Sequence, residues 1–314
     1  MRLGSIFLAL MLFLAAPLRA QDSTRSTYGP AGDHLKQESS KNVDIITPHI
    51  TDSHYLELPF VGEYELPRWK PFHAGGIELD MSPTKHVVFL LLAAALCIGI
   101  MIPAATSNQR QTAHEGHAKG FAGAIESIVL YIRNEVILPN VGHHGNGYVP
   151  FGLTLFFFIL FANLLGLIPY GSTATGNISV TATLALITFV VVEVAGMKAQ
   201  GAAYIKTIIY WPSDQPIAMK LPMTLIMTPV EIIGKFTKPF ALAIRLFANM
   251  TAGHVVLLAL ISLIFTFGSW FIAPAPVVMG VAISMLEIFV AFLQAFIFTL
   301  LASVFIGLIR EGAH

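Results

Sequence analysis

A few polar side chains interrupt a long apolar stretch near the carboxyl terminus, and these are the residues best suited to chemistry. The 71 residues between Lys238 and Arg310 contain two formal charges, Arg245 and Glu287, together with His254. An arginine inside a membrane costs several kcal/mol, with estimates from about 2.5 to more than 10. Such a residue needs a partner or a water-filled cavity, so we expect Arg245 to be functional.

Arg245 has a simpler interpretation, in which its side chain extends from a helix end to the lipid headgroups. Lys238 lies seven residues earlier, which is about 10 Å along a helix at about 1.5 Å per residue. With a second cation this close, the headgroup interpretation stays open on the sequence alone.

Helical spacing places the polar residues of this stretch on shared faces. Arg245 and Asn249 are four residues apart and share one face. Glu231 precedes Arg245 by 14 residues, which leaves the two about 40° apart around a helix, on nearly the same stripe. Glu287 and Gln294 are seven residues apart and share a face of the last apolar segment. The two segments therefore offer two rows of polar groups.

The titratable residues of this stretch predict proton movement. His254 lies nine residues after Arg245 and so on the opposite side of that helix. His254 and Glu287 both titrate, and a histidine–glutamate pair in a site of low dielectric constant can relay protons. For Gln294 a second interpretation is an interhelical hydrogen bond.

Composition argues against a soluble enzyme. Hydrophobic residues make up 55% of the 314 residues and charged residues 11%, with a mean hydropathy of +0.72, whereas soluble domains carry about 25% charged residues. Basic and acidic residues number 18 each, so no basic excess favours nucleic acid. Cys97 is the one cysteine, which excludes an intrachain disulfide and a cysteine-based metal centre. No phosphate-binding loop or nucleophile–base motif occurs, so we expect no metal, no cofactor and no catalytic residue.

The charge distribution predicts three regions. Residues 1–20 have an early arginine, a short apolar run and a small-residue end, which is the layout of a signal peptide. The alternative is an uncleaved membrane helix, but the apolar run is shorter than the roughly 20 residues of a span. Residues 21–85 are polar without a sustained period, which predicts a loosely structured external arm. Residues 86–314 form the membrane domain.

Within the membrane domain we expect an all-α polytopic fold. Three upright spans are predicted at 87–105, 150–168 and 178–197, with a polar loop after the first and an interfacial amphipathic helix at 121–138. Two longer apolar segments follow at 222–267 and 277–309. The second would extend about 50 Å as a helix, against a hydrocarbon thickness of about 30 Å. We therefore predict a strongly tilted carboxyl-terminal helical hairpin, with three upright spans as the alternative.

The positive residues predict the orientation. The segment 198–220 contains three lysines against one aspartate, which is typical of a cytoplasmic loop. A signal peptide leads to the same topology. The mature amino terminus is then periplasmic and the carboxyl terminus cytoplasmic.

Three motifs resemble one family. The run KPFALAIRLFANMTAGH at 238–254 closely resembles the signature of subunit a of F-type ATP synthases, and FANLLGLIPY at 161–170 and LQAFIFTLL at 293–301 also match that family. The resemblance extends from about Phe72 to the carboxyl terminus. It implies a bacterial inner-membrane protein that is not an enzyme by itself. The implied partners are the c-ring, the subunit b stator dimer, the remainder of the ATP synthase and the lipid bilayer.

The resemblance also implies roles for individual residues. Arg245 matches the stator arginine that faces the c-ring carboxylates. Asn249 and Gln294 match its polar neighbours, and Glu231 matches the acidic residue of the cytoplasmic half-channel. His254 and Glu287 match the two titratable positions of the outer half-channel, although some members carry the glutamate first and the histidine second. Thr175 stands where some members have an aspartate, so no carboxylate role transfers there.

The implied function is proton translocation through two offset half-channels. A proton from outside neutralises a c-ring carboxylate, which rotates through lipid and releases the proton into the other half-channel, so that proton flow is coupled to rotation and ATP synthesis. A stand-alone secondary transporter or ion channel is the alternative, but it often has internal repeats, and no convincing repeat occurs. A membrane anchor in which Arg245 only reaches the headgroups is a third possibility.

Overall fold

The structure, a computed structural model, describes most of the chain after residue 52. The described residues are 53, 55–58, 62–69, 72–74, 77–79, 82–115, 120–142, 145–168, 171–209, 216–267, 271 and 273–311. The predicted signal peptide and the first part of the predicted arm lie outside them.

Two short β-hairpins precede helix α4, the first helix in the described part of the chain. Strands β1 (Tyr55–Leu58) and β2 (Gly62–Glu65) pair antiparallel, as do β3 (Phe72–Ala74) and β4 (Ile77–Leu79). The sequence does not reveal them, because strands of three or four residues are too short for a sustained alternation of polar and apolar residues. The Trp69 backbone N–H donates to Ser82 Oγ at 2.9 Å, which ties this region to the residues just before α4.

Helix α4 (Lys85–Glu115) is longer than the sequence predicts. Its apolar part, Lys85–Thr106, agrees with the predicted span. The prediction of a polar loop directly after residue 105 is wrong, because the helix continues through Pro103 to Glu115. A proline removes one helical hydrogen bond, and the residues that follow include good helix formers such as glutamine, arginine and alanine.

The helix predicted at 121–138 consists of three pieces. They are α5 (Gly120–Tyr131), a π-helical turn η1 (Ile132–Ile137) and α6 (Leu138–Val141). No residue of α5 is buried, whereas Ile132, Val136 and Ile137 in η1 are at most 2% exposed. The segment is therefore anchored through its π-helical turn, and a 3₁₀ turn, η2 (Gly145–Tyr148), leads out of it.

Helices α7 (Val149–Gly166) and α8 (Ile178–Gln200) agree with the second and third predicted spans within a few residues. A short 3₁₀ turn, η3 (Ala174–Gly176), lies between them, and a second, η4 (Gly201–Thr207), follows α8. Helix α7 forms the core: Phe156 is fully buried and makes edge-to-face contacts with Phe157, at 5.1 Å between ring centroids, and with Phe292, at 5.5 Å.

The last third folds as two long helices. Helix α9 (Ile217–Phe267) has 51 residues and α10 (Pro274–Glu311) has 38, which correspond to about 76 Å and 57 Å. Three upright spans here would need a break close to Arg245, but α9 passes Arg245 without one. Three prolines, at positions 222, 229 and 239, lie inside α9, and each removes one backbone hydrogen bond.

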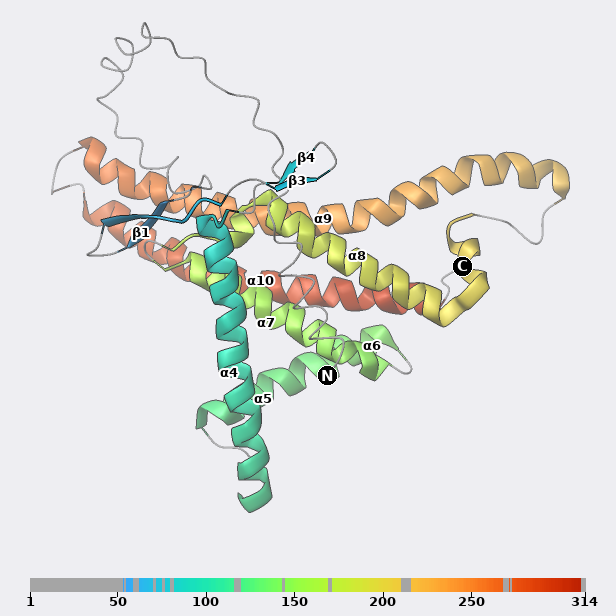
Figure 1. Cartoon of the computed structure of the whole chain (residues 1–314), viewed down its shortest axis with the longest axis horizontal. Coiled ribbons are helices and arrows are strands. Elements are labelled where there is room, and N and C mark those ends of the chain that lie inside the picture. Colours follow the sequence, from blue (N-terminus) through green and yellow to red (C-terminus); the bar gives the residue numbers. More distant parts are fainter. Residues whose placement is uncertain are drawn as a thin grey trace, which may run out of the picture.

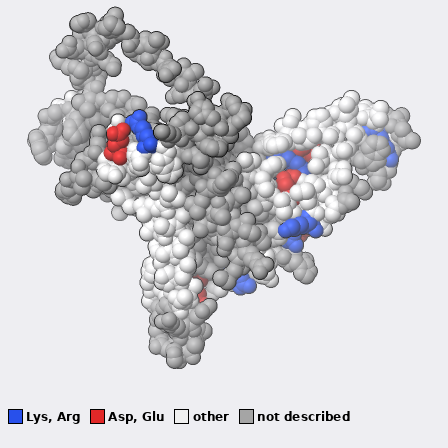
Figure 2. Space-filling view, in the orientation of Figure 1, with Lys and Arg blue, Asp and Glu red and all other residues white. Residues whose placement is uncertain are grey.

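The helices pack around α10. Figure 1 shows α7, α8 and α9 running alongside α10, with α4 running across α7. In the described part of the chain, five helices are long and apolar enough to cross a membrane. Their burial differs sharply, since 67% of the apolar window of the helix at 145–166 is buried but only 6% of that in α9. Helix α9 is therefore packed along one side and uncovered along the other. Among the described residues that face the viewer in Figure 2, charged side chains form a few separate patches between uncharged ones.

Candidate functional site

Arg245 lies on the uncovered side of α9. Its side chain is exposed, whereas Leu242, Ala243 and Leu246 beside it are at most 4% exposed and face the rest of the molecule. Arg245 follows the first residue of α9 by 28 positions and precedes the last by 22, so the nearer end is about 33 Å away along the helix. The guanidinium is therefore displayed from the middle of a helix and not from its end. Neither of the ion pairs found among the described residues involves it.

An amide pair joins the two long helices next to Arg245. Asn249 Nδ2 on α9 donates to Gln294 Oε1 on α10 at 3.2 Å. Gln294 is 2% exposed and Asn249 is exposed. The structure thus brings together two residues that the sequence placed on separate rows. It also confirms the interhelical hydrogen bond considered for Gln294. Because Asn249 is one turn from Arg245, this bond sets the local register between the helices.

Glu287 is buried against the backbone of α9. It is 8% exposed, and a β-carbon at Gly253 would collide with its carboxylate and lie 3.1 Å from its Cδ. Only glycine leaves room for this approach. Gly253 directly precedes His254, which is half-buried, so the carboxylate lies at the turn of α9 that carries the histidine. The sequence does not predict that position 253 must be glycine, because the need for glycine comes from Glu287, 34 positions away.

A buried polar cluster that the sequence did not predict lies beside Glu287. Thr175 Oγ1 in η3 donates to Asn163 Oδ1 on α7 at 2.7 Å, and Asn163 Nδ2 donates to the Ala291 carbonyl oxygen on α10 at 3.2 Å. Both side chains are completely buried. Ala291 lies four residues after Glu287 and three before Gln294, on the same face of α10. In the sequence, the sign of this cluster is Asn163, a polar residue inside a span without charges.

The polar cluster also reaches helix α4. Asn177 accepts from the Ser179 backbone N–H at 2.9 Å and caps α8, and its Nδ2 is 3.5 Å from Nδ1 of the buried His86 on α4. Thr251 Oγ1 on α9 is 3.5 Å from the Gly176 carbonyl oxygen. Polar groups thus continue from the start of α4 through η3 to the part of α9 that precedes Gly253.

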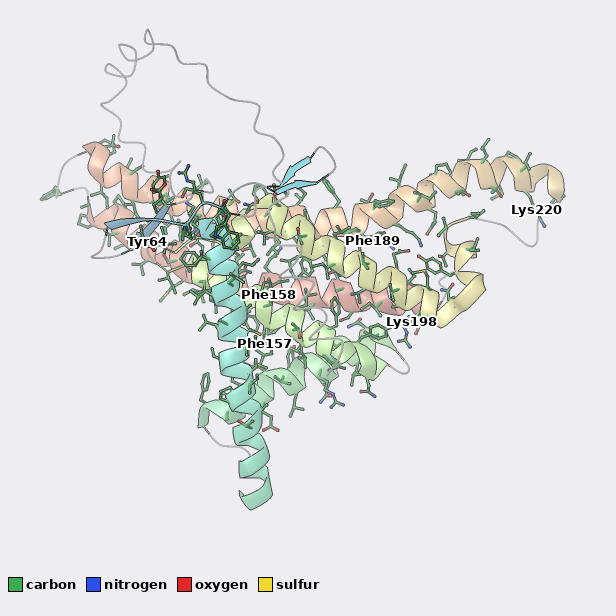
Figure 3. The ribbon with its side chains drawn as sticks, in the orientation of Figure 1. Tyr64, Phe157, Phe158, Phe189, Lys198 and Lys220 are labelled. Atoms are coloured by element: carbon green, nitrogen blue, oxygen red, sulfur yellow. The ribbon has the colours of Figure 1, made fainter. Side chains whose placement is uncertain are left out.

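A pocket of about 140 Å³ lies on the amino-terminal side of Arg245 along α9, between α8, α9 and α10. Glu231 lines it together with Glu193 on α8 and Lys235 on α9, whose side chains form an ion pair at 3.3 Å. Lys238 also contributes to the wall. The apolar part of the wall includes Phe189, which is labelled in Figure 3 where α8 runs beside α9.

The two polar regions lie on opposite sides of Arg245 along α9. Glu231 precedes Arg245 by about 21 Å of helix, and Gly253 follows it by about 12 Å. All six residues singled out from the sequence therefore occur on the two paired long helices: Arg245, Asn249 and Gln294 at the centre, Glu231 at the pocket, and His254 and Glu287 on the other side. Within the described residues, no group of three or more histidine, cysteine, aspartate or glutamate residues could hold a metal ion.

Comparison with known proteins gives consistent matches. Residues 87–307 match the family model described as ATP synthase A chain. ATP synthase subunit a 2 of Chlorobaculum tepidum is 44% identical over 283 residues, covering 88% of this chain and 76% of the relative. ATP synthase subunit a of Chloroherpeton thalassium is 45% identical, covering 83% and 74%. That of Anaeromyxobacter dehalogenans is 40% identical, covering 91% and 75%.

Proposed function

The chain belongs to the ATP synthase A chain family, and from that premise we propose which of its residues carry protons and how. As a member of this family it is the non-catalytic, proton-translocating stator subunit of the F-type ATP synthase, a multi-pass membrane protein that works with the c-ring. The stand-alone transporter is not favoured.

The proton path that we propose consists of two half-channels separated by Arg245. Glu287 and His254, with the buried Asn163–Thr175 cluster beside them, form the outer half-channel. The pocket lined by Glu231 forms the inner one. The observation that carries this proposal is the position of Arg245, exposed at mid-helix between two polar regions that are displaced from it in opposite directions.

Arg245 acts through a charge that it cannot lose, because a guanidinium stays protonated in proteins. Facing the c-ring, it favours the ionised form of a passing carboxylate and so promotes release of the proton to the inner half-channel. The same charge repels protons and blocks direct leakage between the half-channels. A neutralised carboxylate enters lipid at much lower cost than an ionised one, which allows the ring to rotate.

The hydrogen bond between Asn249 and Gln294 positions this arginine. It joins α9 to α10 within one turn of Arg245, so the guanidinium is presented from a braced part of the hairpin. We assign these two amides a positioning role and no proton transfer, because neutral amides do not titrate.

The membrane arrangement follows from helix length. We propose that α4, α7 and α8 cross the bilayer and that α9 and α10 lie strongly inclined, because about 76 Å and 57 Å of helix exceed a hydrocarbon core of about 30 Å. The segment from α5 to α6 lies in the interface. Residues 1–20 are a signal peptide, 21–85 a periplasmic arm and 86–314 the membrane domain of an inner-membrane protein, with a cytoplasmic carboxyl terminus. Surfaces away from the c-ring contact the subunit b dimer and lipid.

Replacing the arginine tests the proposal. Arg245→Ala is expected to abolish ATP-driven proton pumping in inverted membrane vesicles, while the amount of subunit in the membrane stays normal. Arg245→Lys is expected to pump poorly, because an ammonium loses its proton more readily in apolar surroundings. Normal coupled pumping by the alanine variant would refute the assignment and leave the membrane-anchor interpretation.

A further inference from the structure

The pocket at Glu231 contains an ion pair that the proposed proton path does not use. Lys235 Nζ lies 3.3 Å from Glu193 Oε2, and it donates to Tyr204 Oη at 3.1 Å and to Thr207 Oγ1 at 3.3 Å. An ammonium has three N–H donors, so these acceptors satisfy all of them. The two charged side chains are only 14% and 18% exposed. Acceptors from α8 and η4 therefore hold Lys235 firmly.

Lys235 has a second carboxylate close by along its own helix. Glu231 and Lys235 are four residues apart on α9, with the glutamate on the amino-terminal side, which is the favoured order for an ion pair within a helix. Both line the same pocket. In the part of the chain that the structure describes, however, the ion pair of Lys235 is with Glu193, and none involves Glu231.

The other lysine of the pocket is also directed to a partner other than Glu231. Lys238 Nζ lies 5.4 Å from the centroid of the Phe305 ring on α10, in a cation–π contact. Lys235 Nζ likewise lies 4.6 Å from the centroid of the Tyr204 ring. The two cations that follow Glu231 along α9 are thus each held by a neighbouring element.

We propose that Glu193 is a positioning residue of the inner half-channel: by holding the Lys235 ammonium on α8, it keeps that cation from pairing with Glu231, whose carboxylate stays available to exchange protons. The proposal rests on the proposed function of Glu231. The charged and titratable groups that face this site are Glu193 on α8, Tyr204 on η4, and Glu231, Lys235 and Lys238 on α9.

The simplest alternative is that the ion pair only braces α8 against α9. The two interpretations differ in what happens when both charges are removed. Glu193→Gln alone releases Lys235 toward Glu231, so ATP-driven pumping in inverted vesicles is expected to fall about 3- to 10-fold, as for an interaction of about 1 kcal/mol. Adding Lys235→Met removes the competing cation, so the double variant is expected to pump at least about threefold faster than Glu193→Gln alone.

Controls make the outcome decisive. Lys198→Met removes a lysine near the end of α8 that does not line the pocket (Figure 3), so it is expected to pump like the parent. Glu193→Asp keeps the ion pair and is expected to pump faster than Glu193→Gln. All rates are compared at equal amounts of membrane-inserted subunit.

Two results would overturn the inference. One is a double variant that is no faster than Glu193→Gln, which is what a mechanical brace predicts, and the other is a Glu193→Gln variant that pumps normally. Glu231→Gln measured in parallel tests the underlying assignment separately. If that variant pumps normally, Glu231 carries no protons and the proposed inner half-channel fails, whatever the Glu193 variants do.

Discussion

Gly253→Ala tests the close approach of Glu287 to α9 with the smallest possible change. At an exposed position inside a helix, alanine is more favourable than glycine by roughly 0.5–1 kcal/mol. At Gly253 the added methyl group would collide with the Glu287 carboxylate and lie 3.1 Å from both Cγ and Cδ. Overpacking of this kind costs about 1–3 kcal/mol.

The displaced group is a proposed proton carrier, so the effect is expected on proton flux. If the cost of about 1–3 kcal/mol falls on proton transfer, the rate drops about 5- to 160-fold at about 1.36 kcal/mol per tenfold change. We therefore expect Gly253→Ala to pump at least about fivefold more slowly in inverted vesicles, measured by the fluorescence quenching of a pH-sensitive dye after addition of ATP.

Gly234→Ala is the matched control, because Gly234 is on the same helix and a β-carbon added there would meet no neighbouring group within 4 Å. It is expected to pump like the parent. Shortening the carboxylate by one methylene with Glu287→Asp in the Gly253→Ala background is expected to restore part of the rate, since the collision is with the end of the side chain. Equal pumping by the two alanine variants would show that Glu287 does not depend on this contact.

Three further changes test the buried polar contacts and the core. Thr175→Val leaves the completely buried Asn163 Oδ1 without its donor, so we expect about 1–3 kcal/mol of destabilisation, measured as reduced thermal stability of the purified complex; Thr175→Ser, which keeps the hydroxyl, should behave like the parent. Asn249→Leu and Gln294→Leu should be non-additive by about 0.5–1.5 kcal/mol in a double-mutant cycle of pumping rates, because they share one hydrogen bond, and strict additivity would contradict a functional bond. Phe156→Ala should destabilise the complex by about 3–5 kcal/mol, seen as a lower unfolding temperature, and an unchanged temperature would rule out the central packing role of this ring.

Isolated charges and long uncharged runs were the sequence features that predicted the structure best. Arg245 and Glu287 could be found because each is isolated in an uncharged run, and the same contrast predicted α7 and α8 within a few residues. Helical spacing correctly placed Gln294 on one face with Glu287, but it could not say that Asn249 meets Gln294, because that contact depends on how two helices pack.

The remainder of the site depends on long-range contacts. Thr175 and Asn163 are neutral and belong to no periodic pattern. Their burial appears only when η3 packs against α7, α8 and α9, and when α7 packs against α10. Glu193 and Lys235 are 42 positions apart, and each by itself looks like a charge near a helix end or a helix surface. The prediction ended the helix of α4 too early for a local reason. Polar residues that follow a proline can continue a helix as well as end it.

The three prolines of α9 all precede Arg245, and the 22 residues after it contain none. Each proline interrupts the ladder of backbone hydrogen bonds and lets a helix bend. The long helix therefore has a compliant first half and a stiffer second half, joined close to the arginine. We therefore expect bending of α9 to be concentrated on the Glu231 side of Arg245, while the half that contacts Glu287 stays straighter.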